Sequence, residues 1–324
     1  MDSKYRKLLS ELKLLSGKTL ISFHSRGDVE AIASALALRL LLPQATIGSP
    51  DRLGGHARSV LKRLNVSEPG VLMPGELASY DSVVLVDVAN PKMLGALENE
   101  FKTFSGKKVV IDHHITNTQF KGSNVFEFPN RTSCCEVIFD VLKSSGFQVD
   151  KQTAALLLCG AFVDSAGLES ANVETFKAVN ELMLLSGLTI SKVKTLTKRV
   201  VELNEINTVK ANVANATRLK FKREEVAFCS CKAYESATAN QLIKNGVAVA
   251  VCFNEKSGDF SVIRNSKSKV FGKLNVAKFL SKAASRFNGE CGGHELIAGG
   301  KFEVKEVKKV ALFLERELRD VFGN

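Results

Sequence analysis

The sequence predicts an α/β protein with an N-terminal domain built on a doubly wound parallel sheet, a helical connector and a smaller C-terminal α+β domain. Three observations favour this fold class. The chain has 324 residues, which is enough for two domains of ordinary size. Short apolar strand patterns alternate with helix patterns through the first half, as in βαβ units. Strand patterns then return near Leu219, after a mostly helical stretch.

The first half supplies strands and helices in alternation. Residues 19–23 form a short β-type run, and residues 29–42 predict a helix that ends before Pro43. Residues 44–48 predict a second strand and residues 55–64 a second helix.

Two almost wholly apolar strands are predicted at 82–86 and 108–111, the pattern expected when both faces of a parallel sheet are covered. Pro91 opens a helix between them, since proline is favoured at the first helical position. Ser133 caps a further helix that runs to about Lys143.

Residues 152–217 are mostly helical, and Asn172 and Thr189 are plausible helix caps. The later part of this stretch carries many charges and few turn signals, so we expect it to connect two domains. Strand patterns follow at 226–230, 247–253 and 260–263, and helix patterns at 276–286 and 307–321. The expected domains are therefore 1–188 and 218–324, with a connector at 189–217.

Composition excludes several classes of protein. Hydrophobic residues make up 45% and charged residues 24% of the chain, as in ordinary globular proteins, so disorder and fibrous repeats are excluded. The longest apolar stretches fall short of the ~18–20 residues that span a bilayer. The first residues lack the apolar region of a secretory signal. We expect no membrane segment and a cytoplasmic location.

The seven cysteines are odd in number and lie mostly in apolar runs, which indicates reduced, buried thiols. Cys229 and Cys231 form the nearest approach to a metal-binding pair, but no second pair follows at the spacing of a zinc site. The sequence therefore does not favour a structural zinc ion.

The net charge of +11 is concentrated towards the C-terminus. Residues 205–324 hold 21 Lys and Arg against 13 Asp and Glu, a net of +8, whereas residues 1–204 carry a net of +3. This excess favours a polyanionic partner such as nucleic acid, the alternative being a solvated basic face that serves solubility.

Polar residues follow several of the predicted apolar segments. His24 and Asp28 follow the first strand, Asp87 follows the strand at 82–86, residues 112–114 follow the strand at 108–111, and Asp164 ends a later apolar segment. Ligands in open parallel sheets bind beyond the carboxyl ends of the strands. A single aspartate there is commonly a helix cap or turn former. The combination is more specific, since three of the five histidines lie at these strand ends.

Carboxylates and imidazoles without thiolates suit Mn²⁺ or Mg²⁺, and the histidines favour manganese. Two such ions about 3.5–4 Å apart and bridged by one carboxylate would activate a water and stabilise the charge of a phosphoryl displacement.

The polar residues that follow these strands resemble the sequence motifs of the DHH phosphoesterase superfamily, in the branch with a C-terminal DHHA1 domain. That branch includes RecJ-type exonucleases, nanoRNases (oligoribonucleases) and cyclic-di-AMP phosphodiesterases. The motifs appear in family order along most of the chain. They are His24-x-x-x-Asp28-x-Glu30, Asp87 with Asn90-Pro91, Asp112-His113-His114 within the string 111–117, Asp164-Ser-Ala-Gly167, and a glycine-rich loop at 291–299 after a strand carrying Arg264 and Ser266.

Two positions depart from the family pattern. Glu30 stands where the second aspartate of the first motif is usual, so its carboxylate must relocate by about one methylene, and metal preference or rate is expected to differ. Cys291 stands where a third glycine usually precedes the histidine, which reduces backbone freedom in the loop.

The resemblance implies a role for each matching residue. One manganese would be held by His24, Asp28 and Asp87, and the other by Glu30, Asp87, His113 and Asp164. The residues expected to act in catalysis are Asp87, Asp112 and His114. Asp87 would bridge the two ions, His114 would face the scissile phosphate and Asp112 would orient the histidines. Substrate would be bound by Arg264, Ser266, Gly292, Gly293 and His294.

The implied function is a manganese-dependent phosphodiesterase, a 3′→5′ exonuclease or oligoribonuclease on short single-stranded RNA or DNA that releases nucleoside monophosphates. Mg²⁺ and Co²⁺ are the alternative metals. Two other functions stay open. The first is cleavage of cyclic-di-AMP or 3′-phosphoadenosine 5′-phosphate. The second is a non-catalytic role in a replication or repair complex, and Glu30 is the main support for this second alternative. Besides oligonucleotides, the partners considered are a second copy of the chain and a replication or repair protein.

Overall fold

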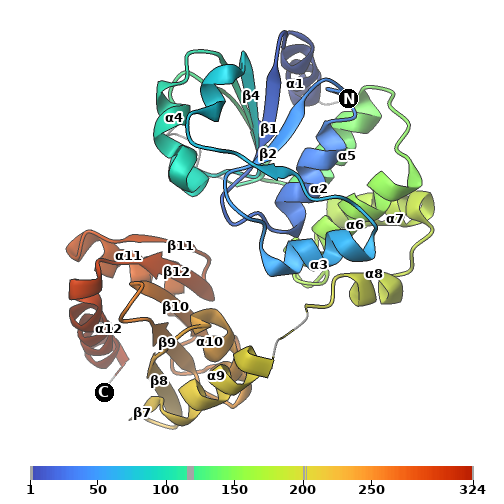
Figure 1. Ribbon diagram of the computed structural model, residues 1–324. Helices are drawn as coiled ribbons and strands as arrows, with labels where there is room; N and C mark the ends of the chain where they lie inside the picture. The colour runs from blue at the N-terminus through green and yellow to red at the C-terminus, as the bar shows by residue number, and fades with distance from the viewer. Residues whose placement is uncertain (1–2, 115–119, 200, 202, 323–324) are drawn as a thin grey trace. The chain divides into compact units, whose positions relative to one another are not determined.

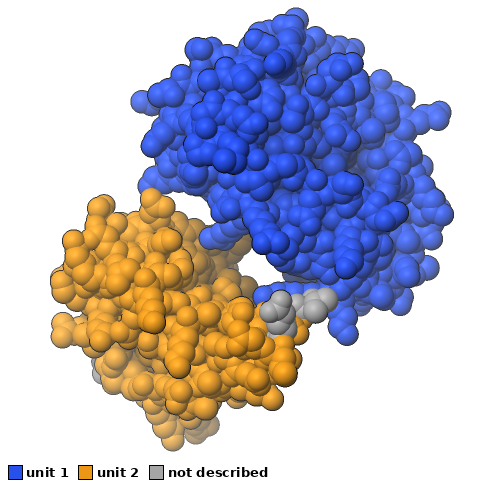
Figure 2. Space-filling model, viewed as in Figure 1, with its two compact units in different colours: residues 1–200 blue, residues 201–324 orange. Residues whose placement is uncertain are grey.

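The computed structural model describes residues 3–114, 120–199, 201 and 203–322. The chain divides into two compact units, Met1–Val200 and Val201–Asn324, which are coloured separately in Figure 2. Each unit contains one six-stranded sheet with helices packed on it (Figure 1). Within the described ranges, no helix combines the length and the apolarity that crossing a membrane requires.

The sheet of the first unit is parallel throughout and has the order β3-β2-β1-β4-β5-β6. In chain order its strands are β1 (Thr19–Ser22), β2 (Thr46–Ser49), β3 (Gly70–Val71), β4 (Ser82–Val86), β5 (Lys107–Asp112) and β6 (Asn124–Glu127). The order confirms the doubly wound parallel sheet that the sequence predicts.

Alternate residues of the central strands pack on opposite faces. Val84 and Val86 join one large core, whereas Val83 and Leu85 join a second core on the other face. The helices of the large core are α1 (Ser3–Lys13), α2 (Val29–Leu38), α3 (Gly55–Arg63), α5 (Cys134–Ser144), α6 (Lys151–Asp164), α7 (Val173–Ser186) and α8 (Ile190–Leu196). The smaller core is closed by η1 (Glu76–Ser79), η2 (Pro91–Leu97) and α4 (Glu98–Thr103) (Figure 1).

The strand order reverses direction between β1 and β4, because the chain leaves these two neighbours towards opposite edges of the sheet. Such a switch point opens a crevice at the carboxyl ends of the strands. Residues that follow β1, β4 and β5 are therefore brought to one edge.

At the opposite, amino edge of the sheet, Asp81 ties three strands together. Its carboxylate accepts the backbone N–H of Lys18 at 2.7 Å, just before β1. Its carbonyl oxygen accepts the N–H of Lys107, the first residue of β5, at 3.1 Å. A side chain at Gly17 or Gly106 would collide with Asp81, so both glycines allow this close approach.

The second unit has a mixed sheet in the order β11-β12-β10-β9-β8-β7. Its strands are β7 (Thr217–Phe221), β8 (Glu224–Ser230), β9 (Val249–Phe253), β10 (Asp259–Arg264), β11 (Glu290–Gly293) and β12 (Ile297–Lys301). One face packs on α11 (Val276–Arg286) and α12 (Val307–Phe322), with the short η3 (Val304–Glu306) before α12. The other face, rich in alanine and cysteine, packs on α9 (Leu203–Ala214) and α10 (Glu235–Lys244).

Some details of the chain differ from the sequence-based expectations. The helix expected to reach Leu42 ends at Leu38, and turns occupy residues 39–41. The glycine-rich segment expected as a loop forms a hairpin, since β11 and β12 pair with Gly292 opposite Gly299. Ser266 lies in a turn after β10 rather than on that strand. The segment 189–217 contributes α8 to the first unit and α9 to the second.

Candidate metal centre

His24, which follows β1, is buried between two carboxylates. Its Nε2 lies 3.3 Å from Asp28 Oδ2 and 3.3 Å from Asp87 Oδ2. Asp28 is the N-cap of α2, and its Oδ1 accepts the N–H of Ala31 at 3.0 Å, which leaves Oδ2 for the histidine. The ligand atoms of His24, Asp28 and Asp87 all lie within 4.8 Å of one another.

His113, at the end of β5, meets a second group of carboxylates. Its Nε2 lies 3.5 Å from Glu30 Oε1, 3.7 Å from Asp87 Oδ1 and 3.8 Å from Asp164 Oδ2. Glu30 comes from the first turn of α2, and Asp164 is the last residue of α6. The ligand atoms of Glu30, His113 and Asp164 likewise lie within 4.8 Å of one another.

Asp87 lies between the two groups. Its Oδ2 faces His24, whereas its Oδ1 faces both His113 and His114, the latter at 3.8 Å. The residue has a φ of 57°, in the left-handed region that few residues other than glycine adopt at low cost. Its N–H is held by the carbonyl of Ile111 on the neighbouring β5 at 3.0 Å, which fixes this turn. The two oxygens of the Asp87 carboxylate thus contact both groups of residues.

Asp112 is fully buried and organises the two histidines that follow it. Its Oδ1 accepts the N–H of His113 at 2.8 Å and bonds Nδ1 of His114 at 2.9 Å. Burial lowers the pKa of His114, but the hydrogen bond and charge of Asp112 outweigh it and raise that pKa to about 8. The imidazole of His114 is more than a third exposed, so it can reach a ligand while Asp112 holds it.

Two observations show that divalent cations fit these residues. Nε2 of His113 is buried, has no hydrogen-bond partner among the described residues and faces three carboxylates. Burial, reinforced by the charges of Asp87 and Asp164, raises the pKa of Glu30, and burial also raises the pKa of Asp164. A cation would relieve this crowding of acidic groups.

His24 responds to the same crowding. Burial by itself lowers its pKa, but the hydrogen bonds and charges of Asp28 and Asp87 raise it to about 10. Burial raises the pKa of Asp28, but the hydrogen bond and charge of His24 outweigh this effect and hold that pKa below its ordinary value. In the metal-free protein a proton on His24 therefore supplies positive charge at this position.

Close helix packing sets the position of Glu30. The Glu30 carboxylate accepts the backbone N–H of Cys134 at the start of α5, an interaction favoured by the partial positive charge of a helix N-terminus. Gly160 of α6 brings that helix close to α2, because a Cβ there would lie 3.2 Å from the Glu30 Cα and would collide with the Cys135 thiol. Sequence reasoning missed the Cys134 contact, which joins residues 104 apart in the chain.

The expected substrate residues lie in the second unit. Arg264 is buried at the end of β10, and its Nη2 donates to Glu295 Oε1 at 2.8 Å, at the tip of the β11–β12 hairpin. Exposed His294 lies at that tip and donates its N–H to the Ile297 carbonyl at 2.7 Å. The structure thus brings Arg264 to the hairpin, whereas Ser266 is exposed in the turn beyond the strand. Sequence reasoning assigned no role to Glu295.

The two glycines of this hairpin differ in their surroundings. Gly293 has a φ of 149°, and a Cβ on it would collide with the Ile297 carbonyl, so the turn requires glycine here. A Cβ on Gly292 would meet nothing within 4 Å, so its backbone is open to an approaching ligand. Residues 115–117 of the motif string around His113 lie outside the described residues.

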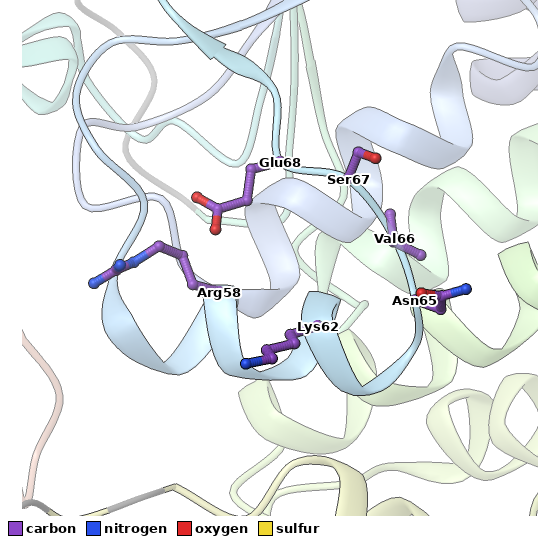
Figure 3. Close-up of a pocket in the computed structure, with 6 residues that line it drawn as sticks. All are labelled: Arg58, Lys62, Asn65, Val66, Ser67 and Glu68. Atoms are coloured by element: carbon purple, nitrogen blue, oxygen red, sulfur yellow. The ribbon is translucent and has the colours of Figure 1, made fainter.

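A surface cavity of about 310 Å³ lies beside α3 in the first unit (Figure 3). It contains none of the predicted site residues. Its lining residues are Arg58, Lys62, Asn65, Val66, Ser67 and Glu68.

Comparison with known protein families matches both halves of the chain. The DHH family, N-terminal domain, matches residues 18–161, and the DHHA1 domain matches residues 232–320. An uncharacterized protein of Methanocaldococcus jannaschii is 23% identical over 90% of this chain and 89% of its own length. A probable manganese-dependent inorganic pyrophosphatase of Streptococcus agalactiae is 24% identical over 54% of this chain, and the match covers 58% of that relative.

Solved structures share the fold of the whole chain at low sequence identity. An exopolyphosphatase-related protein from Bacteroides fragilis is 19% identical with a TM-score of 0.77, covering 99% of this chain and 98% of its own. RecJ from Thermus thermophilus, solved in complex with Mn²⁺, is 12% identical with a TM-score of 0.57, covering 97% of this chain and 55% of RecJ. The chain belongs to the DHH phosphoesterase superfamily, in the branch that carries a C-terminal DHHA1 domain.

Proposed function

We propose that this phosphoesterase is a manganese-dependent 3′→5′ exonuclease or oligoribonuclease that acts on short single-stranded RNA or DNA and releases nucleoside monophosphates. The observation that carries the proposal is the convergence of His24, Asp28 and Glu30 with Asp87, His113 and Asp164 at one edge of the first sheet. His24, Asp28 and Asp87 would hold one divalent ion, and Glu30, Asp87, His113 and Asp164 the other. When bound, the ions supply Lewis-acid stabilisation of charge on the phosphoryl oxygens.

The chain's own groups have distinct tasks in this proposal. His114 lies beside Asp87 and is more than a third exposed, so it would donate a hydrogen bond to a non-bridging oxygen of the scissile phosphate. Asp112 fixes the tautomer and orientation of that imidazole through its Nδ1, leaving Nε2 for the phosphate. Burial of Asp87 and Glu30 excludes water from the carboxylates and strengthens their electrostatic effect.

The second unit supports a nucleotide substrate. Arg264 offers a planar guanidinium suited to forking onto a phosphate, and its Nε is buried without a hydrogen-bond partner among the described residues. Exposed His294 and the open backbone at Gly292 lie on the hairpin beside it. The net charge of +8 in residues 205–324 favours a substrate with several phosphates over one with a single phosphodiester.

Oligonucleotides labelled at either the 5′ or the 3′ end, incubated with Mn²⁺, test the proposal. We expect single-nucleotide steps starting from the 3′ end, on a short RNA or DNA series. His113→Ala should abolish the steps, because it removes the imidazole that faces three carboxylates. Equal products from wild type and His113→Ala, or no cleavage from either end, would contradict the proposal.

A second candidate is hydrolysis of inorganic pyrophosphate, which is favoured by the similarity of the chain to the streptococcal relative over 54% of its length. Both reactions would use the same metal centre. The two candidates are therefore distinguished by whether turnover depends on residues of the second unit. Turnover of pyrophosphate, a linear dinucleotide, cyclic-di-AMP and 3′-phosphoadenosine 5′-phosphate should be compared under equal conditions. Phosphate release from pyrophosphate alone, unaffected by Arg264→Ala, would favour the second candidate.

The same measurements address a non-catalytic role. A chain that only binds its partners would take up little Mn²⁺ and would turn over none of these substrates. Glu30 would be the residue responsible for the weak metal binding. Restoring the shorter carboxylate by Glu30→Asp would then raise metal binding. For an active enzyme we expect bound Mn²⁺ together with turnover in the unaltered chain.

A further inference from the structure

Three cysteines meet in the second unit, whereas the proposed metal centre belongs to the first. Cys229 near the end of β8, Cys231 just after it and Cys252 on β9 form the cysteine cluster, whose sulfurs lie within 4.8 Å of one another. Cys229 and Cys252 are direct neighbours in the parallel β8–β9 pair, so their side chains point to the same face of the sheet. The chain has seven cysteines, so nearly half of them gather at this point.

The spacing of the sulfurs is that of metal ligands rather than of a disulfide. The Sγ atoms of Cys229 and Cys231 are 3.6 Å apart. A disulfide needs about 2.05 Å. Two thiolates that each lie about 2.3 Å from one tetrahedral zinc ion are separated by roughly 3.8 Å. The separation of Cys229 and Cys231 is therefore close to that of two sulfurs on one cation.

Polar groups that are themselves buried hold the cluster in place. Cys229 Sγ donates to the Asn212 carbonyl of α9 at 3.2 Å. The Asn212 side chain donates to the Ala233 carbonyl at 2.9 Å and to Thr238 Oγ1 of α10 at 3.0 Å, which fixes the loop that carries Cys231. Cys231 N–H also donates to the Phe253 carbonyl at 2.7 Å, at the end of β9. Apolar packing alone would not require these buried polar partners.

A soft cation bound among the three sulfurs would displace their protons, and its charge would compensate the buried negative charge of the thiolates.

We propose that Cys229, Cys231 and Cys252 bind one thiophilic closed-shell cation of the Zn²⁺, Cd²⁺ or Cu⁺ class, with the Asn212 carbonyl and the Thr238 hydroxyl as neighbouring oxygen donors. Thiolates select such ions over Mn²⁺ and Mg²⁺, which prefer carboxylates. The site is separate in chemistry and in sequence from the centre formed by His24, Asp87 and His113. It is independent of the function proposed above.

Cadmium is the probe that tests this inference, because thiolate coordination gives an ultraviolet charge-transfer band that carboxylate and imidazole coordination does not. The full chain, reduced and freed of metal, is saturated with Mn²⁺ and then titrated with Cd²⁺. We expect the band to grow linearly and to stop at one equivalent per chain. Absence of the band in the folded wild-type protein overturns the inference.

Variants locate the ion. Cys252→Ser should weaken the band, because it removes one of three thiolates, whereas the matched control Cys159→Ser, which removes a buried cysteine of α6 in the first unit, should leave the band unchanged. An undiminished band in Cys252→Ser assigns the ion elsewhere and overturns the inference.

A measurement on the unaltered chain covers the case in which Cys252→Ser does not fold. X-ray absorption at the cadmium edge counts the neighbours of the first equivalent bound. Three sulfur neighbours are expected, and a shell of oxygen and nitrogen only contradicts the proposal.

Discussion

At the scale of single residues, Asp112 is a side chain whose effect passes through its neighbours. It contacts both His113 and His114, and it is the leading cause of the raised pKa of His114. We expect Asp112→Asn to lower Mn²⁺ affinity or activity by about 10–100-fold, the usual cost of losing a partner that orients metal ligands. The pKa of His114 should fall towards its ordinary value in the same variant.

Calorimetric titration with Mn²⁺ and a pH titration of the His114 ring by NMR in the metal-free protein check this prediction. Asp150→Asn is the matched control, because it changes a carboxylate at the far end of α6 and keeps a capping side chain. Unchanged Mn²⁺ affinity and an unchanged His114 titration would show that Asp112 does not act in this way.

The raised pKa values of two histidines also predict how the stability of the metal-free protein depends on pH. Each histidine has an ordinary pKa of 6.5, whereas the folded values are about 10 for His24 and about 8 for His114. The folded state thus binds more protons, so this contribution to stability is complete below about pH 6.5. It is lost as pH rises through about 8 for His114 and about 10 for His24.

Urea unfolding at a series of pH values, in the presence of a chelator, measures this dependence. The midpoint should fall between pH 6.5 and 8, and Mn²⁺ should reverse the trend, because metal binding is favoured when its ligands are deprotonated. A midpoint that rises with pH in the chelated protein would contradict the assignment.

Much of the candidate site could be predicted residue by residue from the sequence. His24, Asp87 and His113 each follow a short apolar run, and the carboxyl ends of parallel strands share an edge. The contact between Glu30 and the Cys134 N–H could not be predicted, because it depends on how α2 and α5 approach in space.

At the scale of elements, the approach of α2 and α6 sets the geometry of two proposed ligands. Gly160→Ala would place a methyl group against Cys135 and the backbone of Glu30, and would push α6 away from α2. We expect a loss of about 1–3 kcal/mol in unfolding free energy from overpacking, offset by up to about 1 kcal/mol of helix propensity. Mn²⁺ affinity should fall as well, since Glu30 and Asp164 belong to these helices.

Urea unfolding and Mn²⁺ titration of Gly160→Ala, Cys135→Ala and the double variant measure both effects. Cys135→Ala removes the sulfur that the new methyl group would strike, so the double variant should recover part of the stability and affinity. Strictly additive losses would show that the two positions do not share the space.

Elements were predictable where their apolar pattern is strong. The strand at 82–86 has the predicted bounds, and Ser133, Asn172 and Thr189 cap the helices expected of them. The β11–β12 hairpin could not be predicted, because glycines at 292, 293, 299 and 300 carry no strand signal and pair only through their backbones. The cysteine cluster was missed for a similar reason, since Cys252 joins Cys229 through strand pairing and not through a spaced motif.

At the scale of the whole molecule, each unit has its own hydrophobic cores. The cores of the first sheet and those of the second contain residues of one unit only. We therefore expect Mn²⁺ to stabilise the first unit against unfolding and to leave the second unchanged, because the proposed ligands all lie in the first. The basic excess, by contrast, belongs mainly to residues 205–324.

Hydrogen exchange followed by mass spectrometry measures this directly on the full chain. Protection of α2, α5 and α6 should rise with Mn²⁺ concentration, and protection of β8 and β9 should not. His113→Ala is the control that should remove the response in the first unit. A uniform rise across both units would contradict a metal centre confined to the first.

The Asp81 contacts lie at the amino edge of the first sheet, so a substitution there should damage the stability of the fold rather than the chemistry at the opposite edge. Asp81 joins the beginnings of β1, β4 and β5, whereas the proposed ligands follow their ends. Asp81→Ala is therefore expected to be a temperature-sensitive variant, with normal hydrolysis in the cold and irreversible loss of activity on warming. Substitutions of His113 should be inactive at every temperature. Heat-inactivation curves of the two variants distinguish damage to the scaffold from damage to the chemistry.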